Sequence, residues 1–434
     1  MSHTGKAIIT SMIAIMLIVA CGQTPTAPAT AVPLPTLTPV PPTPTRTPTR
    51  TPQPTSTSTP TVSPTIVQPP DPFQLVLDVD NLISGSRHHF YTAPDGGLWL
   101  ITDQGVARLV DGTWRVFLAG FEGELAGIDS SNRLWLVSED TSEISAWDGV
   151  SWTSYGAEAG WLPIGLEDDW YRGAGWGESD STGRFWLTTT QDVRFFDGSH
   201  WSVFTPEDMA MWEVGPEQQW FSFEILISQH SGNVWVGECN WGGPGPFGGA
   251  GVRWLDGDTW QGADSPVSSG CTTVLEEDQS GHIWANTDGD LWRYQPASGD
   301  WTRFSPPDPP KEMMWFGFAD SLTIGPSGDP WPAIVLCGGA SCYGNIVLYH
   351  LHNGVWTQIG DVAEYEGAPY GLAFSNNANW LSWEHTLYRI TADSLEQLTD
   401  LNIQSIAVDN DGRLWLAAWV EGRAMLLTLS TSIE

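Results

Sequence analysis

Residues 180–189 read Asp-Ser-Thr-Gly-Arg-Phe-Trp-Leu-Thr-Thr, and this short pattern, repeated along the chain, decides the fold. A glycine stands three residues before the tryptophan, and an aspartate stands six residues before it. Glycine adopts a left-handed backbone at little cost, and an aspartate side chain can accept hydrogen bonds from nearby backbone amides, so the pattern predicts a tight turn. The apolar residues around the tryptophan predict a short strand directly after it.

The same turn and tryptophan occur eight times. The tryptophans are Trp99, Trp135, Trp186, Trp235, Trp284, Trp331, Trp380 and Trp415. Three residues before them stand Gly96, Asn132, Gly183, Gly232, Gly281, Gly328, Asn377 and Gly412. Six residues before four of them stand Asp129, Asp180, Asp278 and Asp409. Successive tryptophans lie 35 to 51 residues apart, a period typical of the blades of a β-propeller.

A second hairpin signal follows the first in most repeats. An Asp-Gly or Asn-Gly pair precedes another tryptophan by a few residues, first at Asp111-Gly112 and Trp114, then at Asp148, Asp197, Asp256 and Asn353. Such a pair between alternating apolar residues is the strongest short signal for a β-hairpin. Each repeat therefore predicts four short antiparallel strands, and residues 71–434 predict a single all-β propeller of eight blades.

The two ends of this region predict how the ring closes. The eighth repeat contains three strand signals, ending near residue 429, and lacks a fourth. Residues 73–77 read as a strand that belongs to no repeat. We expect this N-terminal strand to complete the last blade. A seven-bladed ring, with one repeat miscounted, is the alternative.

The N-terminus has the features of an export signal. Lys6 precedes an apolar run over residues 7–20, which is too short to span a bilayer as a helix, and Cys21 follows small residues. This resembles the lipobox of bacterial lipoproteins, which implies cleavage of residues 1–20 and attachment of a diacylglyceryl group to Cys21. A secretory signal with an incidental cysteine is the alternative. We expect the protein to be anchored by this lipid to a membrane outside the cytoplasm, at the cell surface or in the periplasm.

Residues 21–70 are dominated by proline, threonine and serine. This composition cannot bury enough apolar surface to form a core, so it predicts a disordered stalk. With about 3.1 Å per residue in an extended polyproline conformation, the stalk could hold the propeller on the order of 100 Å from the membrane.

The repeat, written D-x-x-G-x-L-W-L-x-T followed by G-V-x-R-x-D-G-x-x-W-x-x-F, resembles the two-component regulator propeller repeat. That family occurs in the periplasmic sensor domains of hybrid histidine kinases. The repeat is also similar to streptogramin lyase-like propellers, which use a histidine and acidic residues on the face of the ring. No lyase motif transfers residue by residue to this chain. The resemblance implies a ligand-binding sensor propeller, although no kinase or receiver segment follows the repeats here.

The chain holds 26 tryptophans, and most of them are expected to pack between blades. These include the eight of the repeat and six that begin fourth strands, namely Trp114, Trp152, Trp201, Trp260, Trp301 and Trp356. Other aromatic residues fall in the longer loops between second and third strands and between blades. Aromatic side chains in long loops on a rigid scaffold favour ligand binding. The candidate binding residues are Trp161, Trp170, Tyr171, Trp176, Trp212, Trp241, Trp315 and Trp419. The alternative is that these loops use their aromatic residues as small cores of their own.

Four cysteines follow Cys21, an even number that predicts disulfide bonds in an exported protein. The expected positions of the strands favour the pairs Cys239–Cys271 and Cys337–Cys342. A zinc site is the rival interpretation, but no CxxC motif or histidine pair at ligand spacing supports it.

The net charge of −34, with Lys311 as the only lysine after the signal segment, argues against nucleic-acid binding. A small molecule, a glycan, a peptide or a membrane protein is the expected partner of a monomeric propeller. We expect binding without catalysis and without a cofactor. Two alternatives stay open: a lyase or hydrolase that uses Ca²⁺ or Mg²⁺ in the central channel, and a passive scaffold for a membrane protein. His88-His89, His350 and His352, and two acidic runs at 167–169 and 276–278, are the residues that such chemistry could use.

Overall fold

A computed structural model describes residues 73–83, 88–93, 95–164, 174–211, 221–241, 246–307, 314–338, 341–364, 371–375, 378–383, 385–391, 394–399 and 401–429. The chain divides into two compact units, residues 1–64 and 65–434, and all described residues belong to the second. The predicted signal segment, Cys21 and the stalk lie outside the described residues. Among the described residues, no helix is long and apolar enough to cross a membrane.

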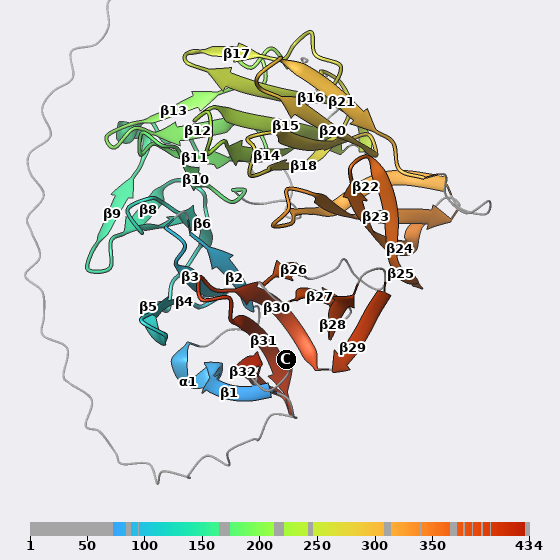
Figure 1. The fold of residues 1–434 in the computed structure, drawn as a ribbon. Coiled ribbons are helices and arrows are strands. Elements are labelled where there is room, and N and C mark those ends of the chain that lie inside the picture. The colour runs from blue at the N-terminus through green and yellow to red at the C-terminus, as the bar shows by residue number, and fades with distance from the viewer. Residues whose placement is uncertain are drawn as a thin grey trace, which may run out of the picture. The chain divides into compact units, whose positions relative to one another are not determined.

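The second unit is an eight-bladed β-propeller of four-stranded antiparallel sheets (Figure 1). Blade 1 is β2 (His88–Thr92), β3 (Leu98–Thr102), β4 (Gly105–Val110) and β5 (Thr113–Ala119). Blade 2 is β6 (Glu124–Ile128), β7 (Leu134–Val137), β8 (Ile144–Trp147) and β9 (Trp152–Tyr155). Blade 3 is β10 (Glu178–Ser179), β11 (Phe185–Thr188), β12 (Val193–Phe196) and β13 (Trp201–Phe204). Blade 4 is β14 (Phe221–Ile227), β15 (Val234–Trp241), β16 (Pro246–Asp256) and β17 (Thr259–Gln261).

The second half of the ring follows the same order. Blade 5 is β18 (Thr272–Glu277), β19 (Ile283–Thr287), β20 (Asp290–Gln295) and β21 (Asp300–Phe304). Blade 6 is β22 (Met314–Ile324), β23 (Pro330–Gly338), β24 (Ser341–His352) and β25 (Val355–Glu364). Blade 7 is β26 (Gly371–Phe374), β27 (Asn379–Trp383), β28 (Thr386–Thr391) and β29 (Ser394–Thr399). Blade 8 is β30 (Asn402–Val408), β31 (Leu414–Val420), β32 (Arg423–Leu429) and β1 (Phe73–Asp78).

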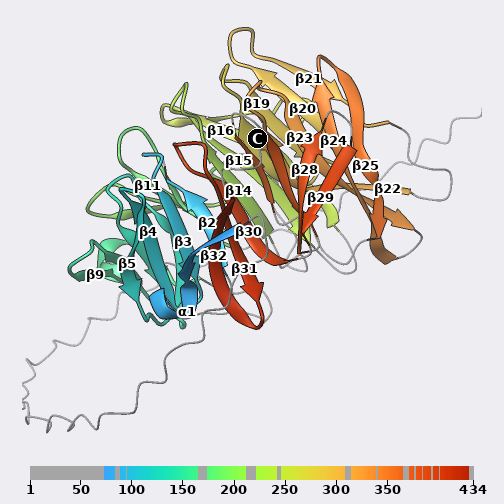
Figure 2. The same cartoon turned by 60° about the horizontal axis from the view of Figure 1, so that its bottom comes forward.

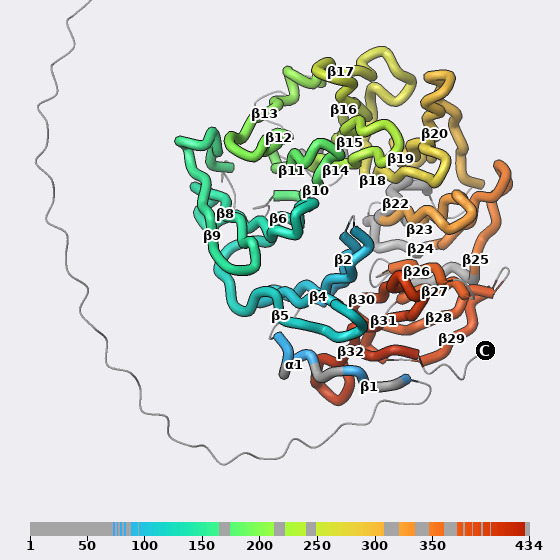
Figure 3. The backbone as a smooth tube through the Cα atoms, turned by 60° about the vertical axis from the view of Figure 1, so that its left-hand side comes forward, coloured from blue at the N-terminus to red at the C-terminus, as the bar shows by residue number. Residues whose placement is uncertain are grey.

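The first strand of each repeat lies innermost. Figure 3 shows β2, β6, β10, β14, β18, β22, β26 and β30 around the centre of the ring, with the fourth strands at its periphery. Side chains on these eight strands are therefore the ones closest to the central axis. They position the candidate site described below.

The N-terminal strand closes the ring, as the sequence predicts. β1 pairs antiparallel with β32, from Phe73 opposite Leu429 to Asp78 opposite Met425, so blade 8 is built from both ends of the repeat region (Figure 2). The short helix α1 (Val79–Leu82) follows β1, and Val79 is fully buried in the cluster between blades 8 and 1. This pairing gives blade 8 its fourth strand and ties the N-terminal end of the propeller to its C-terminal end. Eight blades are confirmed, and the seven-bladed alternative is wrong.

The repeat tryptophans pack between blades. Within the described residues, each junction between neighbouring blades holds its own hydrophobic cluster. All eight repeat tryptophans are at most 6% exposed. Trp135 of blade 2, for example, stacks on Phe185 of blade 3 with ring centroids 5.0 Å apart and planes 8° apart. A buried tryptophan contributes about 150–250 Å² of contact area, so these rings hold each blade against the next.

The aspartate of the repeat joins the turn to the tryptophan. Oδ1 of Asp180 accepts hydrogen bonds from the backbone N–H groups of Thr182 (2.9 Å) and Arg184 (3.0 Å), as expected for a turn cap. Oδ2 accepts a hydrogen bond from Nε1 of Trp186 at 2.8 Å. Indole bonds of the same kind occur at Asp129, Asp278 and Asp409. Gly183 takes the left-handed conformation that the turn requires, with φ 86°.

The guanidinium group of Arg184 completes this arrangement. It lies over the ring of Trp186, 5.1 Å from the centroid, and Nε donates to Oδ2 of Asp180 at 2.6 Å. Burial by itself raises the pKa of Asp180, but the hydrogen bonds from Thr182, Trp186 and Arg184 outweigh that effect. The net pKa of Asp180 is therefore lowered, and its carboxylate stays ionised against the buried indole.

One fourth-strand tryptophan does not pack as predicted. Trp152, the first residue of β9, is 42% exposed, although we expected all six tryptophans at this position to be buried between blades. Its ring contacts Trp147 of the same blade, with centroids 5.2 Å apart. The outer strand of a blade lies at the periphery of the ring, where a neighbouring blade need not cover it.

We predict that Trp186→Phe lowers the free energy of unfolding by about 1.5–3 kcal/mol more than Trp99→Phe does. Both rings are fully buried, but only Trp186 donates a hydrogen bond to an aspartate, while Nε1 of Trp99 has no hydrogen-bond partner in the described part of the chain. The two substitutions therefore remove the same ring and differ by one charged hydrogen bond. Denaturant unfolding of both variants and of wild type measures the difference. Equal losses would show that the bond between the aspartate and the indole does not stabilise the blade.

Candidate functional site

The structure describes the side chains of three of the eight predicted aromatic binding residues. Trp170, Tyr171 and Trp212 lie outside the described residues. Trp241 and Trp315 lie in strands β15 and β22, but their side chains are not among those described. Trp161, Trp176 and Trp419 remain, and they have different environments.

Trp161 was predicted to be a ligand-binding loop residue, but the structure places its side chain in the core. It is fully buried in the cluster between blades 2 and 3, and Nε1 donates to the carbonyl oxygen of Thr141 at 3.0 Å. Its ring meets Trp201 edge-on, with centroids 5.0 Å apart, and the guanidinium group of Arg194 lies 4.5 Å from its centroid. The loop after β9 folds back over this junction and fills the end of the core with its own aromatic residue. For Trp161, the alternative of a small loop core is the one that the structure supports.

Trp176 and Trp419 are half-buried near the innermost strand of blade 1. Trp419, in β31, meets His88 edge-on, with ring centroids 5.7 Å apart. Trp176, just before β10, contacts Tyr91 at 4.8 Å and His89 at 6.3 Å between centroids. Trp176 therefore brings blade 3 against blade 1, two blades away in sequence order. These contacts place two of the predicted aromatic residues beside the histidine pair of the first blade.

Three glutamates occupy the innermost strands of three consecutive blades. Glu178 lies in β10, Glu224 in β14 and Glu276 in β18, and each is partly exposed. The negative charges of Glu178 and Glu224 both act on Glu276, and the charge of Glu178 also acts on Tyr91. We call Tyr91, Trp176, Glu178, Glu224 and Glu276 the channel cluster.

The carboxyl groups of this cluster are hard to ionise. Burial, with the charges of Glu178 and Glu224, raises the pKa of Glu276 to about 8. Burial raises the pKa of Glu224 to about 7, and it raises the pKa of Glu178 as well. Burial and the charge of Glu178 raise the pKa of Tyr91 to about 12. Among the described residues, no positive charge contributes to the pKa of these three glutamates, so their mutual repulsion is not offset.

The sequence carries a signal for three members of this cluster; Tyr91 and Glu178 were not among the predicted site residues, and Glu276 was named only within the acidic run 276–278. Tyr91, Glu178 and Glu276 each stand eight residues before a repeat tryptophan and lie directly opposite it in the sheet. An alignment of the repeats therefore identifies equivalent positions on the innermost strands. Glu224 falls outside this register, eleven residues before Trp235, and no simple pattern marks it.

The three residues of the acidic run 276–278 have three different roles. Glu276 belongs to the channel cluster, and Asp278 caps the turn and accepts the indole N–H of Trp284 at 3.1 Å. Glu277 accepts hydrogen bonds from the hydroxyl group of Ser228 and the backbone N–H of Gln229, both at 2.6 Å. These three carboxylates therefore do not converge on one cation. The other run, residues 167–169, lies outside the described residues.

A cavity of about 390 Å³ also borders the inner strands. It is lined by residues of five blades, among them Phe90, Gln279, Ile324, Leu372 and Ile406. Its side chains are mostly apolar. The inner strands therefore border a cavity formed by blades 1 and 5 to 8, and they carry carboxyl groups in blades 3 to 5.

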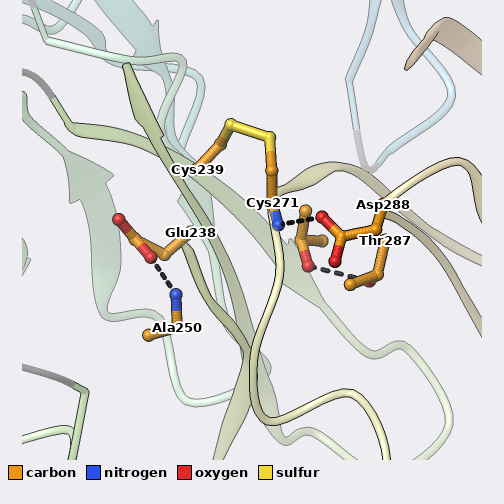
Figure 4. The surroundings of a disulfide bond; sticks show 7 residues. Glu238, Cys239, Ala250, Cys271, Thr287 and Asp288 are labelled. Carbon is orange, nitrogen blue, oxygen red and sulfur yellow. Dashed lines mark hydrogen bonds between the residues drawn. A yellow bond between two sulfur atoms is a disulfide. The ribbon is translucent and has the colours of Figure 1, made fainter. Parts of the chain in front are cut away.

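The predicted disulfide Cys239–Cys271 is present (Figure 4). It joins β15 of blade 4 to the residue before β18 of blade 5, and both cysteines are at most 2% exposed. The backbone N–H of Cys271 donates to Oδ1 of Asp288 at 2.8 Å. The neighbouring carboxylate of Glu238 accepts a hydrogen bond from the backbone N–H of Ala250, and burial raises the pKa of Glu238 to about 7. The side chains of Cys337 and Cys342 are not described, so their pairing stays a prediction.

We predict that Glu276→Gln makes the protein more stable than wild type at pH 8, by at least about 1 kcal/mol. Folding raises the pKa of Glu276 from 4.5 to about 8, so the folded state favours the protonated carboxyl. The resulting stabilisation is fully present in acid and is lost as the pH rises from about 4.5 to about 8. Free energies of unfolding at pH 5 and pH 8 measure the effect. The exposed Glu139→Gln is the control and should leave the pH profile unchanged, whereas a profile equal to wild type in Glu276→Gln would contradict the prediction.

We predict that Cys239→Ala with Cys271→Ala lowers the free energy of unfolding by about 3–4 kcal/mol. The bond spans 32 residues of sequence, and opening it restores the conformational freedom of that loop in the unfolded chain. Denaturant unfolding without reductant provides the measurement. Cys337→Ala with Cys342→Ala, which spans only five residues, should cost less. A loss that is larger for the short pair would contradict this ordering.

Comparison with known families supports the repeat assignment. Residues 397–419, from the end of β29 into β31, match the two component regulator propeller family, which confirms the resemblance predicted from the repeat. No curated protein sequence matches the chain significantly.

Solved propellers resemble the structure at low sequence identity. A streptogramin B lyase structure is 15% identical, with a TM-score of 0.43, over 71% of this chain and 94% of the lyase. The extracellular domain of the hybrid two component system BT3049 from B. thetaiotaomicron is 12% identical, with a TM-score of 0.40, over 84% of this chain and 54% of that domain. YCF48 bound to D1 peptide is 12% identical, with a TM-score of 0.41, over 83% of this chain and 98% of YCF48. The chain thus spans about half of the sensor domain, and these similarities concern the fold.

Proposed function

We propose that this chain is a lipid-anchored, extracytoplasmic propeller that binds a ligand at the centre of its ring and releases it unchanged. The anchor rests on Cys21 and the apolar run before it. The disulfide Cys239–Cys271 supports the location, because such bonds form and persist mainly in oxidising compartments. The stalk of residues 21–70 then holds the propeller away from the membrane, where its faces are open to the surroundings.

The ligand is an organic cation. The observation that carries this assignment is the set of three glutamates, Glu178, Glu224 and Glu276, whose pKa values are raised without an offsetting positive charge among the described residues. Carboxyl groups held in a desolvated position are costly to ionise, and strongly shifted groups of this kind are concentrated at functional sites. A bound ammonium or guanidinium group would stabilise the ionised form of these carboxyl groups.

The aromatic members of the channel cluster suit the same ligand. Tyr91 and Trp176 are in ring contact beside Glu178, and an aromatic face attracts a cation that has lost part of its water. Trp176 is also one of the aromatic loop residues that the sequence predicts for ligand binding. The net charge of −34 draws cations towards the protein as a whole.

The test is a binding screen on the full chain in detergent with cationic probes: choline, spermidine and a trilysine peptide. A ligand at a hundred times its dissociation constant stabilises the fold by about 2.7 kcal/mol, which raises the melting temperature measurably. We expect at least one probe to do so. We also expect Glu178→Gln, Glu276→Gln and Trp176→Ala to weaken its binding, as measured by isothermal titration calorimetry.

Trp152→Ala is the matched control, because it removes an exposed tryptophan from the outer strand of blade 2 and should leave binding unchanged. The absence of a shift with every cationic probe contradicts the proposal. Binding of a neutral glycan that is insensitive to the two glutamate variants contradicts the assignment of the ligand class. A shift with Ca²⁺ or Mg²⁺ alone favours the metal-dependent enzyme instead.

A further inference from the structure

Two histidines and an aspartate lie close together in blade 6, at the end of its strands where β22 turns into β23 and β24 turns into β25. Asp329 directly precedes β23, and His350 and His352 lie at the end of the neighbouring strand β24. Ala333 pairs with Leu348, and the same register continued places Trp331 opposite His350 and Asp329 opposite His352. His350 and His352, two residues apart on one strand, point to the same side of the sheet. The sheet pairing therefore brings a third side chain to the histidine pair, which the sequence alone limited to two ligands.

The three side chains present metal-binding atoms to one another. One ligand atom from each residue lies within 4.8 Å of the other two, and this is the one such group of three in the described part of the chain. Oδ2 of Asp329 lies 2.8 Å from Nδ1 of His352 and 3.5 Å from Nε2 of His350. Nε2 of His350 is buried, and no described residue forms a hydrogen bond with it. The imidazole of His350 therefore directs Nε2 at the carboxylate of Asp329, at a separation too long for a good hydrogen bond, and close to the second imidazole.

Neighbouring residues hold these ligands in place. The ring of Trp331 stacks on His350, with centroids 4.1 Å apart and planes 13° apart, which fixes the direction of the imidazole. The hydroxyl group of Ser327 donates to Oδ2 of Asp329 at 2.6 Å. Nδ2 of Asn353 lies 2.8 Å from Nε2 of His352, and turning this amide over by 180° would present its oxygen to the N–H that Nε2 carries when Nδ1 binds a metal. Metal-binding histidines and carboxylates are characteristically oriented by such outer partners.

We infer that Asp329, His350 and His352 form a binding site for a transition-metal dication, with Zn²⁺ as the natural occupant. Imidazole nitrogens favour zinc and similar metals, whereas Ca²⁺ and Mg²⁺ bind almost entirely through oxygen. Three protein ligands leave the fourth tetrahedral position of Zn²⁺ open to water or to another molecule. The side chain of His352 is 57% exposed, so the open position is reachable from solvent.

This site is independent of the channel cluster. It lies at the end of the strands where the first-to-second and third-to-fourth hairpins of blade 6 turn, and none of its members is on an innermost strand. Two other histidines contact carboxylates, His230 with Glu277 at 3.2 Å and His282 with Asp278 at 2.9 Å. Each of these pairs contains a single imidazole. They are therefore internal controls for the contribution of the second histidine.

The test titrates the full chain, without a histidine tag and under non-reducing conditions, with Co²⁺ as the spectroscopic probe. Tetrahedral Co²⁺ absorbs visible light strongly, and Zn²⁺ then displaces it. We expect one Co²⁺ per chain. Removal of outer-shell partners weakens metal sites by about 10–100-fold, so His350→Gln, His352→Gln and Asp329→Asn should each weaken binding by at least about 100-fold. His352→Gln changes an exposed side chain and should leave the melting temperature in EDTA unchanged, which separates loss of metal from loss of fold.

His230→Gln is the matched control and should bind Co²⁺ as wild type does. The inference is overturned if wild type takes up no Co²⁺ or Zn²⁺. It is also overturned if His350→Gln and His352→Gln bind the metal with unchanged affinity. Loss of the cobalt absorption in Cys337→Ser but not in His350→Gln would assign the metal to cysteine and would likewise overturn it.

Discussion

The propeller depends on the hydrogen bond between a buried aspartate and the indole of the repeat tryptophan. In blade 3, the carboxylate of Asp180 accepts the backbone N–H groups of its turn through one oxygen and Nε1 of Trp186 through the other. Because Trp186 faces the next blade, the side chain of Asp180 fixes both the hairpin turn and the junction between blades 3 and 4. The bond recurs in four of the eight blades, so the ring is held by a local device used repeatedly. Elsewhere the indole has a different environment: Nε1 of Trp99 has no hydrogen-bond partner among the described residues, and Nε1 of Trp380 donates to the hydroxyl oxygen of Ser375 at 3.4 Å.

Features set by neighbouring residues could be predicted from sequence. Turns, strand order and blade number follow from spacing, because each blade is a local unit of sequence that packs mainly against its two neighbours in the ring. Closure by β1 followed from the unfinished eighth repeat, and the disulfide Cys239–Cys271 followed from the expected positions of its strands. Each of these inferences needs only the order of the elements and the face on which they end.

Features that depend on how loops fold over the ring could not be predicted in this way. Trp161 is an aromatic loop residue like Trp176, yet Arg194 and Trp201 enclose it while Trp176 stays half-buried against Tyr91. The difference lies in partners that are distant in sequence. Glu178 and Glu224 of the channel cluster were missed for another reason, since they stand on innermost strands, where sequence position shows neither burial nor the charge of the neighbouring blade. Asp329 was missed because it reaches the histidines only through the pairing of β23 with β24.

The carboxyl groups of the protein separate into two kinds, and the separation bears on function. Asp180 and Asp278 are buried, yet donors from the same repeat surround them and lower their pKa, so these groups are complete within their own blade. Glu224 and Glu276 are half-buried and have no such donors among the described residues, and their pKa values rise to about 7 and about 8. The structural carboxylates Asp180 and Asp278 have hydrogen-bond donors, whereas Glu224 and Glu276 on the innermost strands have none among the described residues. Since an unpaired carboxyl group weakens the fold, the missing partner is best sought outside the chain, among ligands that bring a positive charge to the centre of the ring.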